Sequence, residues 1–311
     1  MRVCRLQASS RGRRGGPGLA VTIGAFDGIH VGHQALLART RTLAAAAGLR
    51  TMLLSFEPLP MEFLRRSEPP ARLTNFRERW RILETSGIDE LGLLRFDAHL
   101  RDLSGAQFMA LLRDLNVRLA VVGHDFRFGR EHSATAEWCR DQAAGYGYSV
   151  EIMPPVTLAQ LRVGSRLVRE ALEHGELDQA ARLLGRPYAM WGRVQRGAQL
   201  GRTLGFATAN IAPRRRRLPL SGIFAVRVNA PALWPRRGWP GVASLGTRPT
   251  VNGVAPLLEA HLFDFEGTLY GHELEVQFVA KLRDEQKFDS IDLLVAQMQR
   301  DAAEARRLLE T

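Results

Sequence analysis

The sequence predicts an α/β fold in which a parallel sheet covered by helices is followed by a small antiparallel β-barrel with a C-terminal helix. Three observations predict it. The 311 residues exceed the usual size of a single domain. Apolar, strand-like runs alternate with helical patterns in the first half, which is typical of a parallel sheet. The second half carries short β-prone segments separated by glycine and proline, which is typical of a barrel.

The first half alternates buried strands with amphipathic helices. Leu19–Gly24 is a short apolar run that ends in glycine, as expected of a buried parallel strand. Apolar residues then recur at helical spacing from Leu36 to Ala47, and Gly48 is a candidate C-cap. The other expected strands are Met1–Leu6, Thr51–Phe56 and Leu119–Gly123, and the other expected helical segments are Phe76–Thr85, Ala106–Leu115 and Ser165–Leu184. This order predicts a Rossmann-like domain.

The character of the chain changes near Gly185–Pro187. The strands expected beyond it are Trp191–Val194, Ile223–Val228, Gly241–Gly246, Leu258–Phe263 and Leu274–Phe278. Apolar residues from Ile291 to Leu309 then lie on one helical face, which Asp289 or Ser290 can cap. We therefore predict one domain over residues 1–186 and a second over residues 187–311.

Composition excludes several classes of protein. The net charge is +11, but Lys281 and Lys287 are the only lysines among 43 basic residues, and the chain is also rich in Ala, Leu and Gly. This joint bias is typical of genome composition, so we expect no nucleic-acid partner. No apolar run reaches the roughly 20 residues that cross a bilayer, so we expect no membrane partner. The two cysteines, Cys4 and Cys139, are too few for a disulfide framework, which favours the cytoplasm. The sequence does not indicate an oligomeric state.

The run Gly24–His33, GAFDGIHVGH, lies where the first buried strand is followed by a helix. Ligands of open α/β sheets bind at that edge, and a helix N-terminus there suits phosphate. His30 and His33 can both face the same phosphates, so we predict them as catalytic residues. The candidate nucleotide-binding residues are Gly24, Phe26, Asp27 and Gly28. The structural alternative is a glycine-rich turn with two incidental histidines.

Two more segments are candidates for the same site. The turn GHDFRFG, residues 123–129, follows a predicted strand and carries Asp125 between aromatic and cationic residues. Phe126 and Phe128 could stack on a flat ring, or could simply lie in the core. The segment RVGSRLVR, residues 162–169, opens a helix, and its candidate phosphate-binding residues are Arg162, Ser165 and Arg169.

These motifs, in this order, resemble the bifunctional riboflavin kinase/FAD synthetase family of bacteria. Gly24–His33 is similar to the HxGH signature of nucleotidyltransferases, and residues 123–129 to the GxDFxFG element of the family. The second half resembles the kinase in GRVQRGAQLGRTLGFATANI, residues 192–211. Further matches are GTRPT at 246–250, LEAH at 258–261, LYG at 269–271 and KLRDE at 281–285.

The resemblance implies that ATP phosphorylates riboflavin to FMN, and that a second ATP adenylylates FMN to FAD. In the kinase, Thr208 and Asn210 would coordinate Mg²⁺, and Glu259 would be the general base. The resemblance further implies nucleotide contacts by Gly197, Gly201 and Gly205, a catalytic role for Asp125 near the acceptor, and flavin contacts by Phe126, Phe128 and Arg283.

The match is weak at several positions, among them Ala134 and Thr135, where the family usually has a glycine and an acid. The family commonly has Asn at Ala25, hydroxyl residues at Gly164 and Arg166, and Pro at Ala207. The first three lie in the adenylylation motifs, which leads to the hypothesis of an intact kinase with a weakened adenylyltransferase.

Two other functions compete with this one. A nucleotidyltransferase for another phosphorylated acceptor, with a binding barrel appended, leaves Thr208, Asn210 and Glu259 unexplained. A basic flavin- or nucleic-acid-binding protein without catalysis leaves His30 and His33 unexplained.

Overall fold

The chain forms two compact units in the computed structural model, which describes residues 1–7, 10, 16–196, 206–250 and 253–310. The first unit comprises Met1–Pro70 and Arg79–Gly164, and the second comprises Ala71–Glu78 and Ser165–Thr311. The segment Ala71–Glu78 is thus part of the second unit, although it lies in the first half of the sequence. The bounds of these compact units differ from the domain boundary that the sequence predicts near residue 186. That domain boundary stays a prediction.

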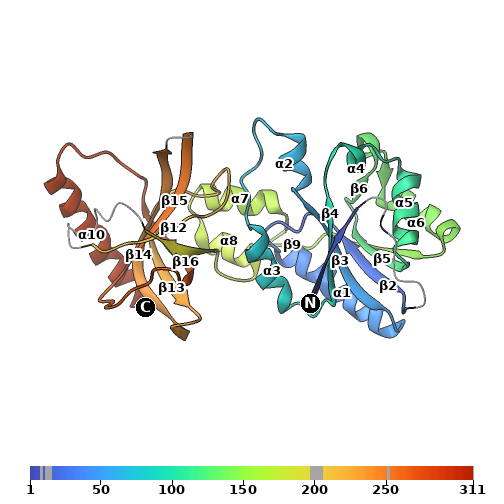
Figure 1. Ribbon diagram of the computed structural model, residues 1–311, viewed down its shortest axis with the longest axis horizontal. Helices are drawn as coiled ribbons and strands as arrows, with labels where there is room; N and C mark the ends of the chain where they lie inside the picture. The colour runs from blue at the N-terminus through green and yellow to red at the C-terminus, as the bar shows by residue number, and fades with distance from the viewer. Residues whose placement is uncertain (8–9, 11–15, 197–205, 251–252, 311) are drawn as a thin grey trace. The chain divides into compact units, whose positions relative to one another are not determined.

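The first unit is built on a six-stranded parallel sheet with the strand order β1-β4-β3-β2-β5-β8 (Figure 1). Its strands are β1 (Arg2–Leu6), β2 (Leu19–Ile23), β3 (Arg50–Glu57), β4 (Glu90–Arg95), β5 (Val117–Gly123) and β8 (Ser149–Met153). The central strand β2 is buried on both faces, which explains its uninterrupted apolar sequence.

Helices cover both faces of this sheet. They are α1 (Val31–Ala46), α2 (Pro60–Leu64), α4 (Ala98–Asp102), α5 (Gly105–Asp114) and α6 (Ala136–Ala143), with α3 (Phe76–Glu84) beginning in the second unit. Helices α5 and α6 pack on the face that presents Leu19, Val21 and Ile23. Helix α1 packs against β2, β3 and β5. The small ribbons β6 (Arg127–Phe128)–β7 (Ala134–Thr135) and β9 (Thr157–Leu158)–β10 (Leu161–Arg162) complete this unit, with 3₁₀ turns at Arg130–His132 and Ala144–Tyr146.

The second unit is a closed antiparallel barrel with the strand order β11-β12-β15-β14-β13-β16. The strands are β11 (Ala189–Gln195), β12 (Ala209–Ile211), β13 (Gly222–Ala230), β14 (Trp234–Thr250), β15 (Gly253–Leu262) and β16 (Glu273–Arg283). Alternate residues are buried along these strands, for example Leu274, Val276 and Phe278, so the barrel interior is filled by side chains.

Among the described residues, three helices lie wholly in the barrel unit. They are α7 (Ser165–Glu173), α8 (Leu177–Leu184) and α10 (Ile291–Leu309). Helix α10 packs on the outside of the barrel through Ala305 and Leu309, which contact Ala225 and Phe263. Ser290 is its N-cap and accepts a hydrogen bond from the Leu293 amide at 3.2 Å, which confirms one of the two expected caps.

The predicted fold class is confirmed, although the helices α2, α4 and α6 and the two small ribbons were not predicted and other details differ. The strands β4, β8 and β12 were not predicted, because their short sequences carry charged or polar residues and become strands by pairing with neighbours. The helical segment Ser165–Leu184 is two helices, separated at Gly175 with φ of 75°. The basic run 214–217 lies in a loop, but Arg215 is buried.

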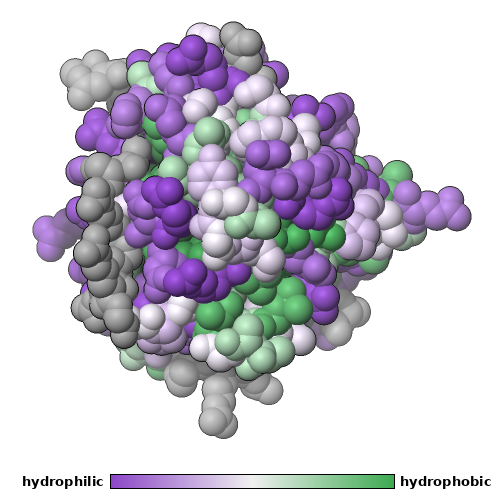
Figure 2. Space-filling view, turned by 90° about the vertical axis from the view of Figure 1, so that its right-hand side faces the viewer, coloured by the Kyte–Doolittle hydropathy of each residue, from purple (hydrophilic) through white to green (hydrophobic). Residues whose placement is uncertain are grey.

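The surface in Figure 2 is the face at the right-hand side of Figure 1, and hydrophilic residues dominate it, with hydrophobic patches between them. Among the described helices, none combines the length and the apolar character needed to cross a membrane.

Candidate functional site

The loop between β2 and α1 has an unusual backbone at the carboxyl edge of the sheet. Phe26 and Ile29 adopt positive φ angles of 50° and 44°, and Gly28 has a φ of 83°. A positive φ at a non-glycine residue costs about 1–3 kcal/mol of conformational free energy, so this conformation persists only where the surrounding structure holds it. Here Phe26 and Ile29 are each 1% exposed, so packing holds both. This loop leads into the N-terminus of α1 at the edge where α/β proteins bind ligands.

His30 and His33 lie together at this helix start. His30 is the N-cap of α1, and its Nδ1 accepts a hydrogen bond from the His33 amide at 3.3 Å. Because Nδ1 accepts, the proton of a neutral His30 ring lies on Nε2. The His30 and His33 rings stack at 3.6 Å, and Phe26 stacks on His33 at 4.4 Å.

The stacking places His33 in an apolar environment. Burial of the ring, and secondly the neighbouring His30, hold the pKa of His33 well below its usual value of 6.5. His33 Nδ1 is buried, although part of the residue stays accessible. A neutral His33 is therefore the form present at neutral pH, where it can hydrogen-bond a phosphate without carrying a charge.

The second predicted motif lies beside the first, because β5 is the neighbour of β2 in the parallel sheet. Its turn is closed by the Phe126 amide, which donates to the Gly123 carbonyl at 3.0 Å. Asp125 forms an ion pair with Arg162, so two predicted site residues meet at this edge. A side chain at Gly32 would come within 3.8 Å of the Val163 carbonyl oxygen, so the Arg162 segment also lies against the start of α1.

The remaining residues of these motifs take different environments. Phe128 is 8% exposed and packs against Phe108 at 4.6 Å, so it is part of the core, whereas Phe126 is partly buried. Ser165 and Arg169 lie on α7 in the second unit, where Arg169 Nε donates to the Ala71 carbonyl at 2.6 Å. Their contacts with a nucleotide stay predictions, as does a flavin contact by either phenylalanine.

The second candidate site lies on the barrel, where Asn210 and Glu259 are directly paired across the antiparallel strands β12 and β15. Cross-strand partners project from the same face of the sheet, about 5 Å apart at Cβ. Their strand neighbours Ala209, Ile211 and Ala260 are at most 5% exposed, as expected of residues that fill the barrel. Thr208 directly precedes β12. An amide and a carboxylate thus project from one face of the barrel, and a hydroxyl residue lies two positions before the amide in the sequence.

The other predicted residues of the barrel are Arg283 and three glycines. Arg283 forms a bidentate ion pair with Asp301 of α10, with Nη2 at 2.7 Å from Oδ2, and its flavin contact stays a prediction. Gly197, Gly201 and Gly205 lie outside the described residues.

Sequence reasoning missed two residues that hold these sites. Arg79 donates to the Ala25 carbonyl at 2.8 Å, and His261 Nδ1 donates to the Ala207 carbonyl at 2.9 Å. The sequence analysis predicted no role for either residue, because each contacts a backbone carbonyl oxygen of a segment that is distant in the sequence. The one available signal was the match of LEAH, residues 258–261, to the family.

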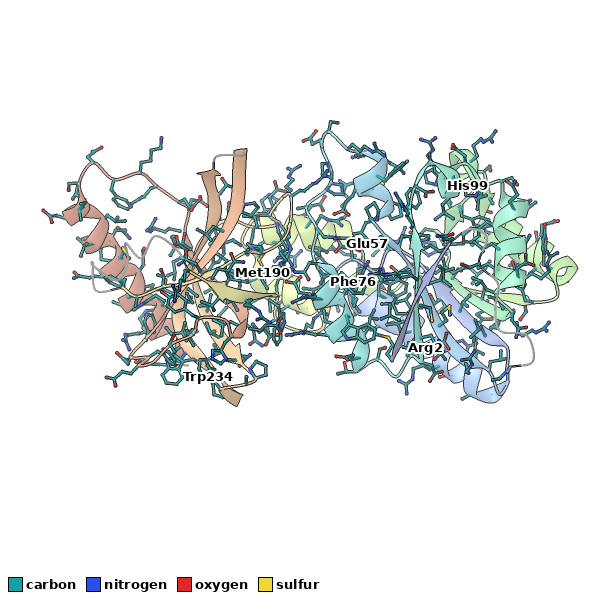
Figure 3. The ribbon with its side chains drawn as sticks, in the orientation of Figure 1. Arg2, Glu57, Phe76, His99, Met190 and Trp234 are labelled. Atoms are coloured by element: carbon teal, nitrogen blue, oxygen red, sulfur yellow. The ribbon has the colours of Figure 1, made fainter. Side chains whose placement is uncertain are left out.

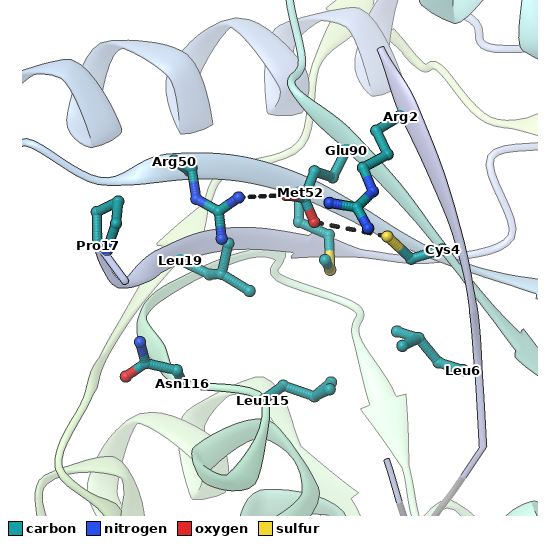
Figure 4. A pocket seen from close by; sticks show the side chains of 10 residues that line it. All are labelled: Arg2, Cys4, Leu6, Pro17, Leu19, Arg50, Met52, Glu90, Leu115 and Asn116. Carbon is teal, nitrogen blue, oxygen red and sulfur yellow. Dashed lines mark hydrogen bonds and ion pairs between the residues drawn. The ribbon is translucent and has the colours of Figure 1, made fainter. Parts of the chain in front are cut away.

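A cavity of about 170 Å³ lies at the opposite, amino-terminal edge of the parallel strands (Figure 4). Its polar lining includes Arg50, whose guanidinium pairs with Glu90 at 2.5 Å, and Cys4, whose thiol contacts Glu90 at 3.7 Å. Because ligands of this fold class bind at the carboxyl edge, this cavity is separate from the candidate site.

Fold and site together define a two-part enzyme class, in which a Rossmann-like nucleotide-binding unit is joined to a small antiparallel barrel. The family model described as FAD synthetase matches residues 15–167, and the one described as riboflavin kinase matches residues 184–309.

Full-length relatives agree with both matches. The bifunctional riboflavin kinase/FMN adenylyltransferase of Pseudomonas fluorescens is 42% identical and covers 94% of this chain and 93% of its own length. That of Escherichia coli K12 is 41% identical over 93% of this chain and 92% of its own. The chain therefore belongs to the bifunctional riboflavin kinase/FMN adenylyltransferase family.

A solved structure shares this architecture. The crystal structure of a macrolide-efflux protein from Streptococcus pneumoniae has a TM-score of 0.79 and 31% identity, and 97% of each chain is covered.

Proposed function

We propose that this chain phosphorylates riboflavin to FMN on the barrel and adenylylates FMN to FAD at the β2–α1 loop. The observation that carries the proposal is that each family-model match contains one candidate site: His30 and His33 in the first, Asn210 and Glu259 in the second. Both activities use ATP, and the matched pair of regions supports the bifunctional enzyme over a kinase with a weakened adenylyltransferase.

In the phosphorylation step, the ribityl 5′-hydroxyl oxygen attacks the γ-phosphorus of ATP and ADP leaves. Glu259 takes the hydroxyl proton, and its position opposite Asn210 holds the carboxylate beside the nucleotide. The oxygen donors Thr208, Asn210 and Glu259 fit a hard cation. Thr208 and Asn210 would hold a magnesium ion, which when bound neutralises phosphate charge. Among the described residues no group of three His, Cys, Asp or Glu could hold a metal alone, so the ATP phosphates would complete its coordination.

In the adenylylation step, a phosphate oxygen of FMN attacks the α-phosphorus of ATP, and pyrophosphate leaves. No protein nucleophile is needed, so the protein contributes position and charge stabilisation. The start of α1, with His30 at its N-cap, faces the phosphates and stabilises their negative charge, and Asp125 and Arg162 border the same edge. We place both reactions in the cytoplasm, where the two free cysteines stay reduced.

The test uses one variant for each site and separates the flavins by chromatography. Glu259→Gln incubated with riboflavin, ATP and Mg²⁺ should form no FMN, yet should convert supplied FMN to FAD. His30→Ala should form FMN and stop there. The exposed residue His132 offers a control, because His132→Ala should retain both activities. FAD formation by His30→Ala at the parent rate would remove the first site from the proposal, and FMN formation by Glu259→Gln would remove the second.

A further inference from the structure

Arg79 is a fully buried arginine of the first unit, at 0% exposure. A buried guanidinium is costly unless its donors are satisfied and its charge is balanced. Its partners therefore indicate what it does. They come from the loop after β2 and from the end of β3, and both segments border the carboxyl edge of the sheet.

The guanidinium joins three groups. Nη1 donates to the Ala25 carbonyl at 2.8 Å and lies 3.4 Å from Ser55 Oγ. Nη2 donates to Glu57 Oε2 at 2.9 Å, and this carboxylate balances the charge (Glu57 is labelled in Figure 3). Ser55 Oγ also donates to the Ala25 carbonyl, at 3.2 Å. The Ala25 oxygen thus accepts one charged and one neutral hydrogen bond.

Ala25 is the residue at which the positive-φ loop begins. Phe26 follows it with a φ of 50°, and the Phe26 ring covers His33, which in turn stacks on His30. The amide of Gly24 is held by the Leu54 carbonyl at 3.1 Å. Gly24 is therefore fixed by the sheet, whereas the next peptide is fixed by Arg79 and Ser55. Without that second anchor, the strained backbone of Phe26 has fewer contacts that hold it in place.

We propose that Arg79 is a positioning residue for adenylyl transfer, which fixes the Ala25 peptide and so the loop that binds ATP. The inference rests on the proposed function of the Gly24–His33 segment. Arg79 acts through the backbone of Ala25, so the side chain at position 25 is not needed for this contact. The loss of an Asn side chain at Ala25 therefore leaves the anchor unchanged.

The test compares kinetics of FAD formation from FMN at varied ATP. Arg79→Met keeps the length of the side chain but removes its donors, Arg79→Lys keeps a charge and one donor, and Ser55→Ala removes the neutral partner. Arg77→Met is the matched control, because Arg77 is on the same helix but its side chain is 61% exposed. Riboflavin phosphorylation by the same preparation serves as an internal reference for folded enzyme.

We expect Arg79→Met to raise the KM for ATP in adenylylation by about 10- to 100-fold, because a hydrogen bond from a charged donor contributes about that factor. Ser55→Ala should raise it about fivefold, for one neutral hydrogen bond. Arg79→Lys should recover most of the loss. Riboflavin phosphorylation and the KM for FMN should stay at the parent values in all three variants.

The proposal would be overturned if Arg79→Met kept the parent KM for ATP and lost activity only in proportion to the amount of folded enzyme. If Arg79→Met does not fold, parent-like ATP kinetics in Ser55→Ala would overturn it as well, because that variant is expected to raise the KM for ATP about fivefold. His30→Ala, measured in parallel, separates the two claims. If His30→Ala abolishes FAD formation while the Arg79 and Ser55 variants match the parent, only the positioning role fails. If His30→Ala retains FAD formation, the assignment of the site fails.

Discussion

The ion pair between Glu78 and Arg215 anchors the segment Ala71–Glu78 within the barrel unit. The side chains are 2% and 0% exposed. The Glu78 carboxylate also accepts hydrogen bonds from the amides of Trp191 at 2.9 Å and Asn75 at 2.7 Å. Glu78→Ala therefore removes a charge partner from Arg215 and acceptors from two amides at once.

The size of the effect follows from this burial. Breaking a buried pair by removing one partner costs about 3–5 kcal/mol, because a buried charge is left behind. That is a large share of the roughly 5–15 kcal/mol that stabilises a folded domain. We expect the free energy of unfolding of Glu78→Ala to fall by about that amount, measured by urea unfolding followed by tryptophan fluorescence.

Two comparisons make this measurement decisive. Arg77, one residue before Glu78, forms an exposed ion pair with Glu273 at 3.1 Å, and Arg77→Ala should cost less than about 1 kcal/mol. The double variant Glu78→Ala with Arg215→Met removes both charges and should lose clearly less than the sum of the losses of the single variants Glu78→Ala and Arg215→Met. A double loss equal to that sum, or equal losses for Glu78→Ala and Arg77→Ala, would refute the reasoning.

Three further predictions concern protonation, the barrel site and thiol chemistry. The depressed pKa of His33 means that the unfolded chain takes up a proton below about pH 6.5 while the folded chain does not. Above about pH 6.5, His33 therefore has no effect on the free energy of unfolding. Below that pH, the free energy of unfolding falls by up to about 1.4 kcal/mol for each pH unit. His33→Phe should flatten this slope in urea unfolding between pH 7.5 and 5.5, and equal slopes would contradict the assignment. His261→Ala should raise the KM for ATP in riboflavin phosphorylation about fivefold, by releasing the Ala207 carbonyl, with adenylylation as the unaffected control. Burial raises the pKa of Cys139 to about 12, so iodoacetamide at pH 8 should modify Cys4 in the folded protein and reach Cys139 only after unfolding, as peptide mass analysis would record.

Local patterns in the sequence were sufficient for most of the fold. Leu19–Ile23 is a strand because its apolar run is buried on both faces, and Ile291–Leu309 is a helix because its apolar residues repeat on one face behind a serine cap. The same holds for His30 and His33, which lie within one turn at the start of a helix, where spacing alone brings them together.

Contacts between distant segments were decided only by the tertiary structure. Asn210 and Glu259 are 49 positions apart in the numbering, and barrel register makes them partners. Arg79 and Ala25 are separated by 54 positions and meet through a backbone oxygen, which leaves no sequence pattern. The segment Ala71–Glu78 belongs to the barrel unit, and its Glu78 pairs with Arg215, a buried arginine of the basic run 214–217. Sequence periodicity reports the environment of a residue along its own element, whereas pairing, register and buried charge depend on which segments the folded chain brings together.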